Sequence, residues 1–288
     1  MPRTDPEWLD RMYNNRALVP DHGAHFARWA ADSAAARATQ ACALDLPYGP
    51  GAGETLDVFL PAEAAGSGGA PVLVFIHGGY WRALDKSDHS FIAPAFTAQG
   101  ACVVVPNYAL CPVVTIPQIT LQMVQALAWV ARHIAEFGGD PRRITVVGHS
   151  AGGQLAAMLL LCQWPRVARD LPSTLVRRAL AISGVFDLAP LRHTPFVKDD
   201  LRLTSVQVAR ASPARLPAPR AGILAAVVGG DESAEFIRQN RLIREAWGAR
   251  AVPVCEELPG RNHFSALEAL VEPRHRLYVL ALGMLQER

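Results

Sequence analysis

The sequence predicts an α/β protein with a mostly parallel central sheet and helices on both faces. From residue 72 onward, apolar and β-branched runs alternate with amphipathic stretches, which is the pattern of strands joined by crossover helices. The run 72–76 is apolar without interruption, as expected for a strand buried on both faces. Half of the 288 residues are hydrophobic and 19% are charged, a composition typical of a globular core. We expect a single domain over 1–288.

The elements follow one another in a simple order. The first two strands, separated by a Pro-Tyr-Gly-Pro-Gly loop, predict a hairpin-like antiparallel start. A helical arm (1–40), in which Asp5 and Pro6 suit the N-cap and first turn, and a Pro-rich insertion without clear periodicity (190–220) are expected to decorate the domain as cap elements. Residues 61–71 form a surface connection. Strands are expected at 41–46, 54–60, 72–76, 101–105, 144–147, 178–183, 222–228 and 252–258, and helices within 5–40 and at 85–99, 117–137, 150–163, 233–247 and 264–286.

Composition excludes several classes of function. The formal net charge is +2 and the arginines are scattered, so nothing favours nucleic acid or an anionic membrane as a partner. The five cysteines lack CxxC spacing, which argues against a disulfide framework or a zinc knuckle. The first seven residues lack the apolar segment of a secretory signal, and no run is long enough to cross a bilayer. We expect a cytoplasmic protein with a small-molecule substrate; a homodimer remains open, because the sequence does not define the oligomeric state.

The segment Gly148–Gly152, Gly-His-Ser-Ala-Gly, is the strongest functional signal. An apolar strand leads into it and a helix-forming stretch follows it. Gly-x-Ser-x-Gly at a strand-to-helix turn predicts a nucleophile elbow, in which Ser150 sits on a strained turn with its hydroxyl exposed.

A serine nucleophile needs a base that is oriented by an acid. The base is predicted to be His263, in the loop between the last strand and the last helix. The acid is predicted to be Asp231, just past the strand 222–228 on a glycine turn, where it could also cap the next helix. Glu232 and Asp187 are the rival acids, because each also follows the end of a strand.

The segment His77–Trp81, His-Gly-Gly-Tyr-Trp, ends the first long parallel strand. A glycine-rich loop at this place predicts backbone amides aimed at developing negative charge, which is an oxyanion hole. The amide of Ala151, directly after the nucleophile, is expected to add a donor. His77 is expected to brace this loop rather than to move protons.

These motifs resemble the α/β-hydrolase superfamily, near the hormone-sensitive-lipase-like esterases. The His-Gly-Gly-Tyr-Trp loop and the N-terminal Tyr-Asn-Asn-Arg at 13–16 are similar to the kynurenine formamidase (arylformamidase) branch. The resemblance implies an oxyanion hole made by the amides of Gly79, Tyr80 and Ala151, with Gly78 shaping the turn. Tyr80 stands where lipase-like relatives commonly have a third glycine, and its ring is expected to narrow the acyl side of the site.

The resemblance implies a serine hydrolase that cleaves an aryl formamide such as N-formylkynurenine, without a metal or cofactor. A carboxylesterase acting on small short-acyl esters uses the same machinery and is the alternative. A ligand-binding protein with an inactive site is disfavoured, because serine, acid and base are all present. Tyr80 and Trp81 are predicted to bind substrate. Four aromatic residues of the arm are expected either to line the pocket or to belong to the core: Trp8, Tyr13, Phe26 and Trp29.

Overall fold

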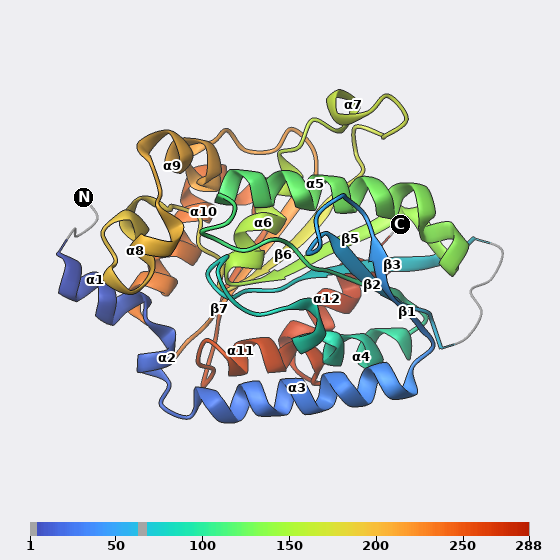
Figure 1. Ribbon diagram of the computed structural model, residues 1–288, viewed down its shortest axis with the longest axis horizontal. Helices are drawn as coiled ribbons and strands as arrows, with labels where there is room; N and C mark the ends of the chain where they lie inside the picture. The colour runs from blue at the N-terminus through green and yellow to red at the C-terminus, as the bar shows by residue number, and fades with distance from the viewer. Residues whose placement is uncertain (1–4, 63–67, 288) are drawn as a thin grey trace.

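A sheet of eight strands runs through the middle of the molecule in the order β1-β2-β4-β3-β5-β6-β7-β8 (Figure 1). The computed structural model describes residues 5–62 and 68–287. β1 and β2 pair antiparallel, as do β2 and β4, whereas all other neighbours are parallel. The predicted antiparallel start and mostly parallel sheet are therefore confirmed. The strands are β1 (Cys42–Pro47), β2 (Thr55–Phe59), β3 (Ala70–Ile76), β4 (Cys102–Pro106), β5 (Gly139–His149), β6 (Arg178–Ile182), β7 (Ile223–Gly229) and β8 (Val254–Leu258).

Side chains along each central strand alternate between two apolar cores. In β3, Val72, Val74 and Ile76 belong to one core, while Leu73 and Phe75 belong to the other, because successive strand residues point to opposite faces. The first core is covered by α5 (Ile116–His133), α6 (Ala151–Leu160) and α10 (Ala234–Ala251), and the second by α3 (His22–Thr39), α4 (Ala93–Thr97), α11 (Ser265–Glu268) and α12 (Arg276–Gln286). Figure 1 shows α5 above the sheet and α3, α4 and α11 below it.

The N-terminal arm forms α1 (Pro6–Tyr13), α2 (Asn15–Leu18) and α3. The predicted cap is confirmed: the Asp5 side chain accepts a hydrogen bond from the Trp8 amide, and Pro6 occupies the first turn. α1 packs against α8 (Pro195–Leu201) and α10, and α1 and α8 lie together at the left of Figure 1. The arm and the insertion thus meet each other, although about 180 residues separate α1 from α8 in the sequence.

The insertion 190–220 is more regular than its sequence indicated. It contains α8, α9 (Ser205–Ala211) and two 3-10 turns, Ala189–Arg192 and Pro213–Arg215. α9 begins with a capping box in which Thr204 and Gln207 bond each other's backbone amides. These helices have seven residues each, too few to give a recognisable amphipathic period.

Two predicted helices are broken into shorter pieces. The segment 85–99 forms the 3-10 turns Lys86–Asp88 and Ser90–Ile92 before α4. The segment 264–286 forms α11, the turn Ala269–Val271 and then α12. Pro273 explains the second break, since a proline disfavours helical backbone at the residue before it, and Glu272 is extended with φ −89° and ψ 106°. The predicted connection 61–71 falls in part on residues 63–67, which lie outside the described residues.

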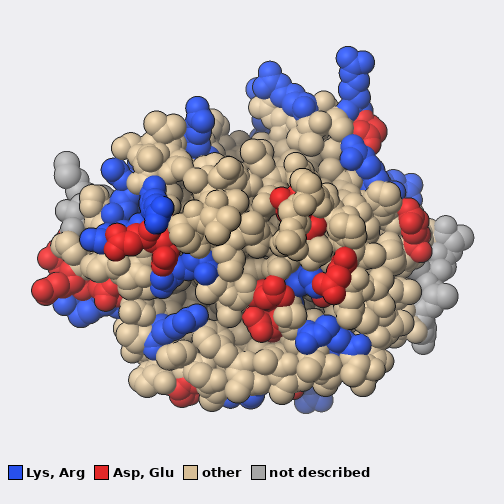
Figure 2. Space-filling view, in the orientation of Figure 1, with Lys and Arg blue, Asp and Glu red and all other residues tan. Residues whose placement is uncertain are grey.

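Charged side chains are dispersed over the surface. On the face drawn in Figure 2, Lys and Arg are interspersed with Asp and Glu rather than gathered into one patch. Within residues 5–62 and 68–287, no helix is both long and apolar enough to cross a membrane.

Candidate active site

Ser150 lies on a strained turn between β5 and α6. Its backbone has φ 55° and ψ −115°, a conformation that non-glycine residues rarely adopt and that clusters at functional sites. The Ser150 amide donates to the Ile182 carbonyl at 2.8 Å. A Cβ added at Gly148 would lie 2.0 Å from the Gly152 oxygen, and one added at Gly152 would lie 2.0 Å from the Ile76 oxygen. The two glycines of the motif are therefore required by close backbone packing, as expected for a nucleophile elbow.

His263 is held by a buried carboxylate. Its Nδ1 lies 2.6 Å from Glu232 Oε2, and the Glu232 side chain has no exposed surface. The other carboxylate oxygen, Oε1, accepts hydrogen bonds from the Gly229 amide at 2.8 Å and from the Ser183 hydroxyl. A buried carboxylate whose oxygens are all hydrogen-bonded in this way can fix the ring orientation and tautomer of the histidine.

The prediction that Asp231 orients His263 is therefore wrong, and the rival Glu232 takes this place. Beyond β7 the chain turns so that the Glu232 amide donates to the Gly229 carbonyl at 3.2 Å. This turn brings Glu232 back toward the strand end, whereas Asp231 is exposed and its amide bonds the Arg261 carbonyl at 3.0 Å. The other rival, Asp187, pairs with Arg215 at 2.8 Å. Ser183, which also holds Glu232, was not identified from the sequence, although it too follows the end of a strand.

The loop that carries His263 is anchored on both sides. Asn262 Oδ1 accepts the amides of Phe264 and Ser265, both at 2.9 Å, which folds the loop back on itself. His149 Nε2 lies 2.9 Å from the His263 carbonyl oxygen. Burial lowers the pKa of His149 well below its usual value, so its ring is neutral and donates this hydrogen bond. His149 thus positions the His263 backbone.

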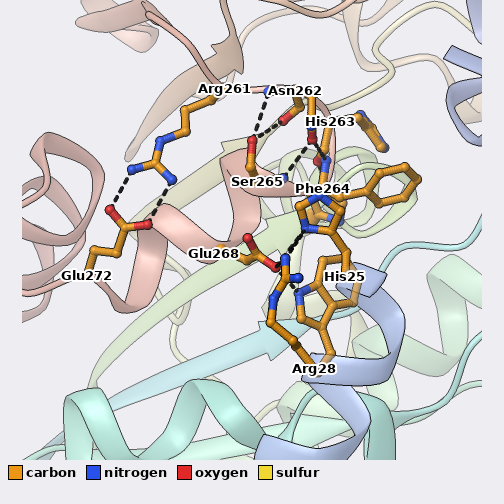
Figure 3. A network of polar contacts seen from close by, with 11 residues as sticks. His25, Arg28, Arg261, Asn262, His263, Phe264, Ser265, Glu268 and Glu272 are labelled. Carbon is orange, nitrogen blue, oxygen red and sulfur yellow. Dashed lines mark hydrogen bonds and ion pairs between the residues drawn. The ribbon is translucent and has the colours of Figure 1, made fainter. Parts of the chain in front are cut away.

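Side chains of the arm reinforce the same loop, as Figure 3 shows. His25 Nδ1 and the Arg28 guanidinium of α3 both reach Glu268 Oε1 at 2.8 Å. At the other end of the loop, Arg261 binds Glu272 through both carboxylate oxygens. The arm is therefore tied to the segment that follows His263.

The loop 77–81 leaves the backbone amides of Gly79 and Tyr80 free to face the site, because the carbonyl groups of the same peptide bonds are held on the other side. The Tyr108 hydroxyl lies 2.9 Å from the His77 and Gly78 carbonyl oxygens, and the Gly79 carbonyl accepts the Arg82 and Ala83 amides at 3.1 Å. Because the N–H and C=O of a trans peptide point in opposite directions, the Gly79 and Tyr80 amides face the other way. Among residues 5–62 and 68–287, no backbone carbonyl accepts a hydrogen bond from either amide or from that of Ala151 at the start of α6.

The predicted bracing role of His77 is confirmed. His77 is fully buried, stacks on Tyr108 with ring centroids 4.2 Å apart, and lies 3.1 Å from Asn107 Oδ1. Burial lowers its pKa, so the ring is neutral. Gly78 lies against the elbow, because a Cβ added there would be 3.1 Å from Ser150 Cβ.

Tyr80 and Trp81 take opposite sides of this loop. Tyr80 lines the cavity, and its hydroxyl donates to the Tyr13 carbonyl at 2.5 Å. Trp81 is fully buried in the core beneath the loop, where its indole N–H donates to Gln154 Oε1 at 3.2 Å. The predicted substrate contact by Trp81 is therefore wrong: residues 80 and 81 both have positive φ (51° and 55°), and this turn sends the second side chain inward.

A cavity of about 640 Å³ opens over these groups. Of the arm's aromatic residues, Phe26 and Trp29 line it, whereas Tyr13 is buried in the core. Burial raises the pKa of the Cys111 thiol to about 11, so this cysteine is a poor nucleophile at neutral pH. The cavity is lined by Asn14, Asn15, Arg16, Phe26, Trp29, Gly79, Tyr80, Arg82, Ala83, Leu84, Cys111, Pro112, His149, Ser150, Phe196, Asp200, His263 and Phe264.

Solved structures share this architecture. A candidate thioesterase of Silicibacter sp. TM1040 superposes with a TM-score of 0.83 at 31% identity, over 95% of this chain and 98% of that one. The carboxylesterase EstE1, cloned from a metagenomic library, superposes with a TM-score of 0.65 at 22% identity, over 81% and 85% of the two chains. The chain has the α/β-hydrolase fold.

Sequence comparisons identify the branch. Residues 56–194 match the BD-FAE family model. Kynurenine formamidase of Danio rerio is 31% identical over 91% of this chain and 88% of its own length, and that of Salmo salar is 30% identical over 84% and 81%. Esterase LipQ of Mycobacterium tuberculosis is 36% identical over 50% of this chain. The chain belongs to the kynurenine formamidase branch of the α/β-hydrolase superfamily and is a serine hydrolase.

Proposed function

We propose that this enzyme hydrolyses aryl formamides such as N-formylkynurenine, with Ser150, His263 and Glu232 as its catalytic triad. The observation that carries the proposal is the position of His263, which shares a cavity with Ser150 and bonds a buried carboxylate through Nδ1. The kynurenine formamidase relatives support the choice of substrate.

In the proposed mechanism, the Ser150 hydroxyl attacks the formyl carbon while His263 Nε2 takes its proton. Glu232 stabilises the imidazolium that forms. The amides of Gly79, Tyr80 and Ala151 bind the oxyanion. His263 then protonates the departing aryl amine, which leaves poorly without that proton. Water then attacks the formyl ester while His263 takes its proton. As the bond from the formyl carbon to Ser150 Oγ breaks, His263 gives this proton to Ser150 Oγ, and the formic acid that leaves ionises to formate.

A small acyl group suits this site. The Tyr80 ring lies edge-on to Phe196, with centroids 5.2 Å apart, and its hydroxyl is fixed on the arm. The ring occupies space beside the acyl group that would be empty if this residue were a glycine. We therefore expect kcat/KM to fall from formyl through acetyl to butyryl esters of one alcohol, and a preference for butyryl would contradict this role of Tyr80.

A carboxylesterase acting on small esters is the second candidate. It is favoured by the 36% identity between half of this chain and Esterase LipQ. Parallel measurement of kcat/KM for N-formylkynurenine and p-nitrophenyl acetate separates the two functions, with S150A as the blank. We expect N-formylkynurenine to be the better substrate; turnover of the ester alone would establish the carboxylesterase.

A further inference from the structure

Arg16 brings an uncompensated positive charge to the cavity wall. Its guanidinium lies 5.3 Å from the centre of the Phe26 ring. In the described part of the chain, no carboxylate forms an ion pair with it, whereas Arg82, the other arginine of the wall, pairs with Asp200. A substrate anion could bind Arg16 without first displacing a carboxylate of the protein.

Asn15, beside Arg16, has an unused hydrogen-bond donor. The residue is 5% exposed and lines the cavity, and its side-chain nitrogen is buried with no hydrogen-bond partner among the described residues. Buried amide groups in folded proteins nearly always have partners. A ligand oxygen at this end of the cavity would supply the missing acceptor.

A row of aromatic rings connects His263 to Arg16. The Phe264 ring lies 5.5 Å from that of His263, and the Phe26 ring lies 5.2 Å from that of Phe264. Arg16 stands over the last ring of the row. An aromatic leaving group bound along this wall would extend its substituent toward Arg16.

We propose that Arg16 and Asn15 bind a carboxylate on the leaving group and so determine substrate specificity. This inference rests on the proposed function and narrows it to aryl formamides whose amine portion carries a carboxylate. Guanidinium suits this task, because it stays charged and presents paired donors that match a carboxylate. Arg16 is exposed, so solvent screens part of the attraction.

Two matched pairs of substrates test the proposal. The first is N-formylkynurenine and its α-carboxamide, and the second is 3-(4-acetoxyphenyl)propanoate and its carboxamide. For each pair, the ratio of kcat/KM for carboxylate to carboxamide is measured in the wild type, Arg16→Gln, Arg16→Lys and Arg11→Gln. Arg11 is the control, because it is an exposed arginine of the same arm outside the cavity wall.

We expect a wild-type ratio of about ten, as for one charge-assisted contact that is partly screened. The ratio should fall close to one in Arg16→Gln, through KM rather than kcat, and be partly kept in Arg16→Lys. Arg11→Gln should keep the wild-type ratio. Asn15→Asp should lower the ratio below that of Arg16→Gln, since it places a negative charge beside the carboxylate.

The proposal would be overturned if the ratio of carboxylate to carboxamide kcat/KM were near one in the wild type for both pairs. It would also be overturned if Arg16→Gln had the same ratio as the wild type. Turnover of the acetates alone, with a ratio that depends on Arg16, would remove the formamidase function and leave the carboxylate site standing. Turnover of N-formylkynurenine with a ratio that is the same in Arg16→Gln and the wild type would support the formamidase function and remove the carboxylate site.

Discussion

The edge of the sheet and the wall of the cavity are built in different ways. Ser150 directly follows the carboxyl end of β5, Glu232 lies in the turn after β7, and His263 lies in the loop after β8. The arm side of the wall comes from α2 and α3, and α8 supplies Phe196 and Asp200. The residues of the proposed triad therefore stand past the carboxyl ends of parallel strands of one sheet, whereas much of the wall is added from distant parts of the chain.

We expect the strand ends to carry out the reaction and the wall of the cavity to select the substrate. Strand ends are fixed by the ladder of the sheet, and functional groups of α/β proteins gather there. The arm is held by side-chain contacts outside this ladder, such as the hydrogen bonds from the Tyr80 hydroxyl to the Tyr13 carbonyl and from the Ser233 hydroxyl to the Met12 carbonyl, both at 2.5 Å. Substitutions at the strand ends should abolish turnover, while substitutions in the arm should change which substrate is turned over.

The largest effect is expected at the strand end that carries Ser150. S150A removes the proposed nucleophile, and kcat should fall roughly 10⁴- to 10⁶-fold. Turnover of p-nitrophenyl acetate measures this loss, with circular dichroism to confirm folding. A variant that keeps most of its activity would show that the reaction does not pass through Ser150.

A smaller but still large loss is expected at the end of β7. In the proposed mechanism Glu232 stabilises the imidazolium and selects the tautomer of His263, so Glu232→Gln should lower kcat roughly 10²- to 10⁴-fold. Glu232→Asp keeps the charge and should retain more activity than Glu232→Gln. Equal losses in the two variants would mean that volume, rather than charge, is what this position requires.

The junction between arm and sheet contains a buried histidine that should make stability depend on pH. His89 packs against Trp29 of α3 and Phe75 of β3, and in both cases the ring centroids are 5.7 Å apart. Burial lowers its pKa to about 3, whereas an unfolded histidine has a pKa of about 6.5. Between these values the unfolded chain binds a proton that the folded chain does not, so the free energy of unfolding decreases as pH falls below about 6.5.

The slope from this one residue should approach about 1.4 kcal/mol per pH unit. Urea denaturation at pH 7.5, 6 and 5 measures the slope. His89→Gln should lose less stability than the wild type over this range, even if it starts from a lower value. An unchanged slope would mean that His89 is not the group responsible.

The smallest effect is expected at the contact between the loop 77–81, which follows β3, and the N-terminal arm. Tyr80→Phe removes the hydrogen bond between the loop 77–81 and the arm but keeps the aromatic ring. A loss of about 0.5–1.5 kcal/mol is typical of one such bond, so kcat/KM should fall by a few fold. Hydrogen exchange of residues 6–18 should become faster. Unchanged exchange would mean that the arm is held independently of Tyr80.

The sequence predicted the strand ends better than the wall, and particular residues show why. Ser150 follows a strand whose apolar run is unmistakable, and His263 lies in the loop between the last expected strand and the last expected helix, so both positions needed no tertiary information. Asp231 and Glu232 are adjacent in sequence, and which of them faces His263 depends on the turn after Gly229. Trp81 was misplaced for the same reason, because positive φ at a non-glycine residue is set by the surroundings.

The arm could not be placed from its own residues. Phe26 and Trp29 lie one turn apart on α3 and fit either a core or a cavity wall. Only the packing of α3 against the segment after His263, through Glu268, shows that they line the site. A local pattern defines a helix and its apolar face, but not the partner of that face.

The sharpest test of the proposed triad is the rate at which a fluorophosphonate labels Ser150, since this reaction needs the triad but no knowledge of the substrate. The wild type, Glu232→Gln and Asp231→Asn are compared, and the adduct is mapped by peptide mass. We predict an adduct on Ser150, labelling at least about 100-fold slower in Glu232→Gln, and an unchanged rate in Asp231→Asn. Slow labelling of Asp231→Asn with fast labelling of Glu232→Gln would contradict the assignment of Glu232 as the acid.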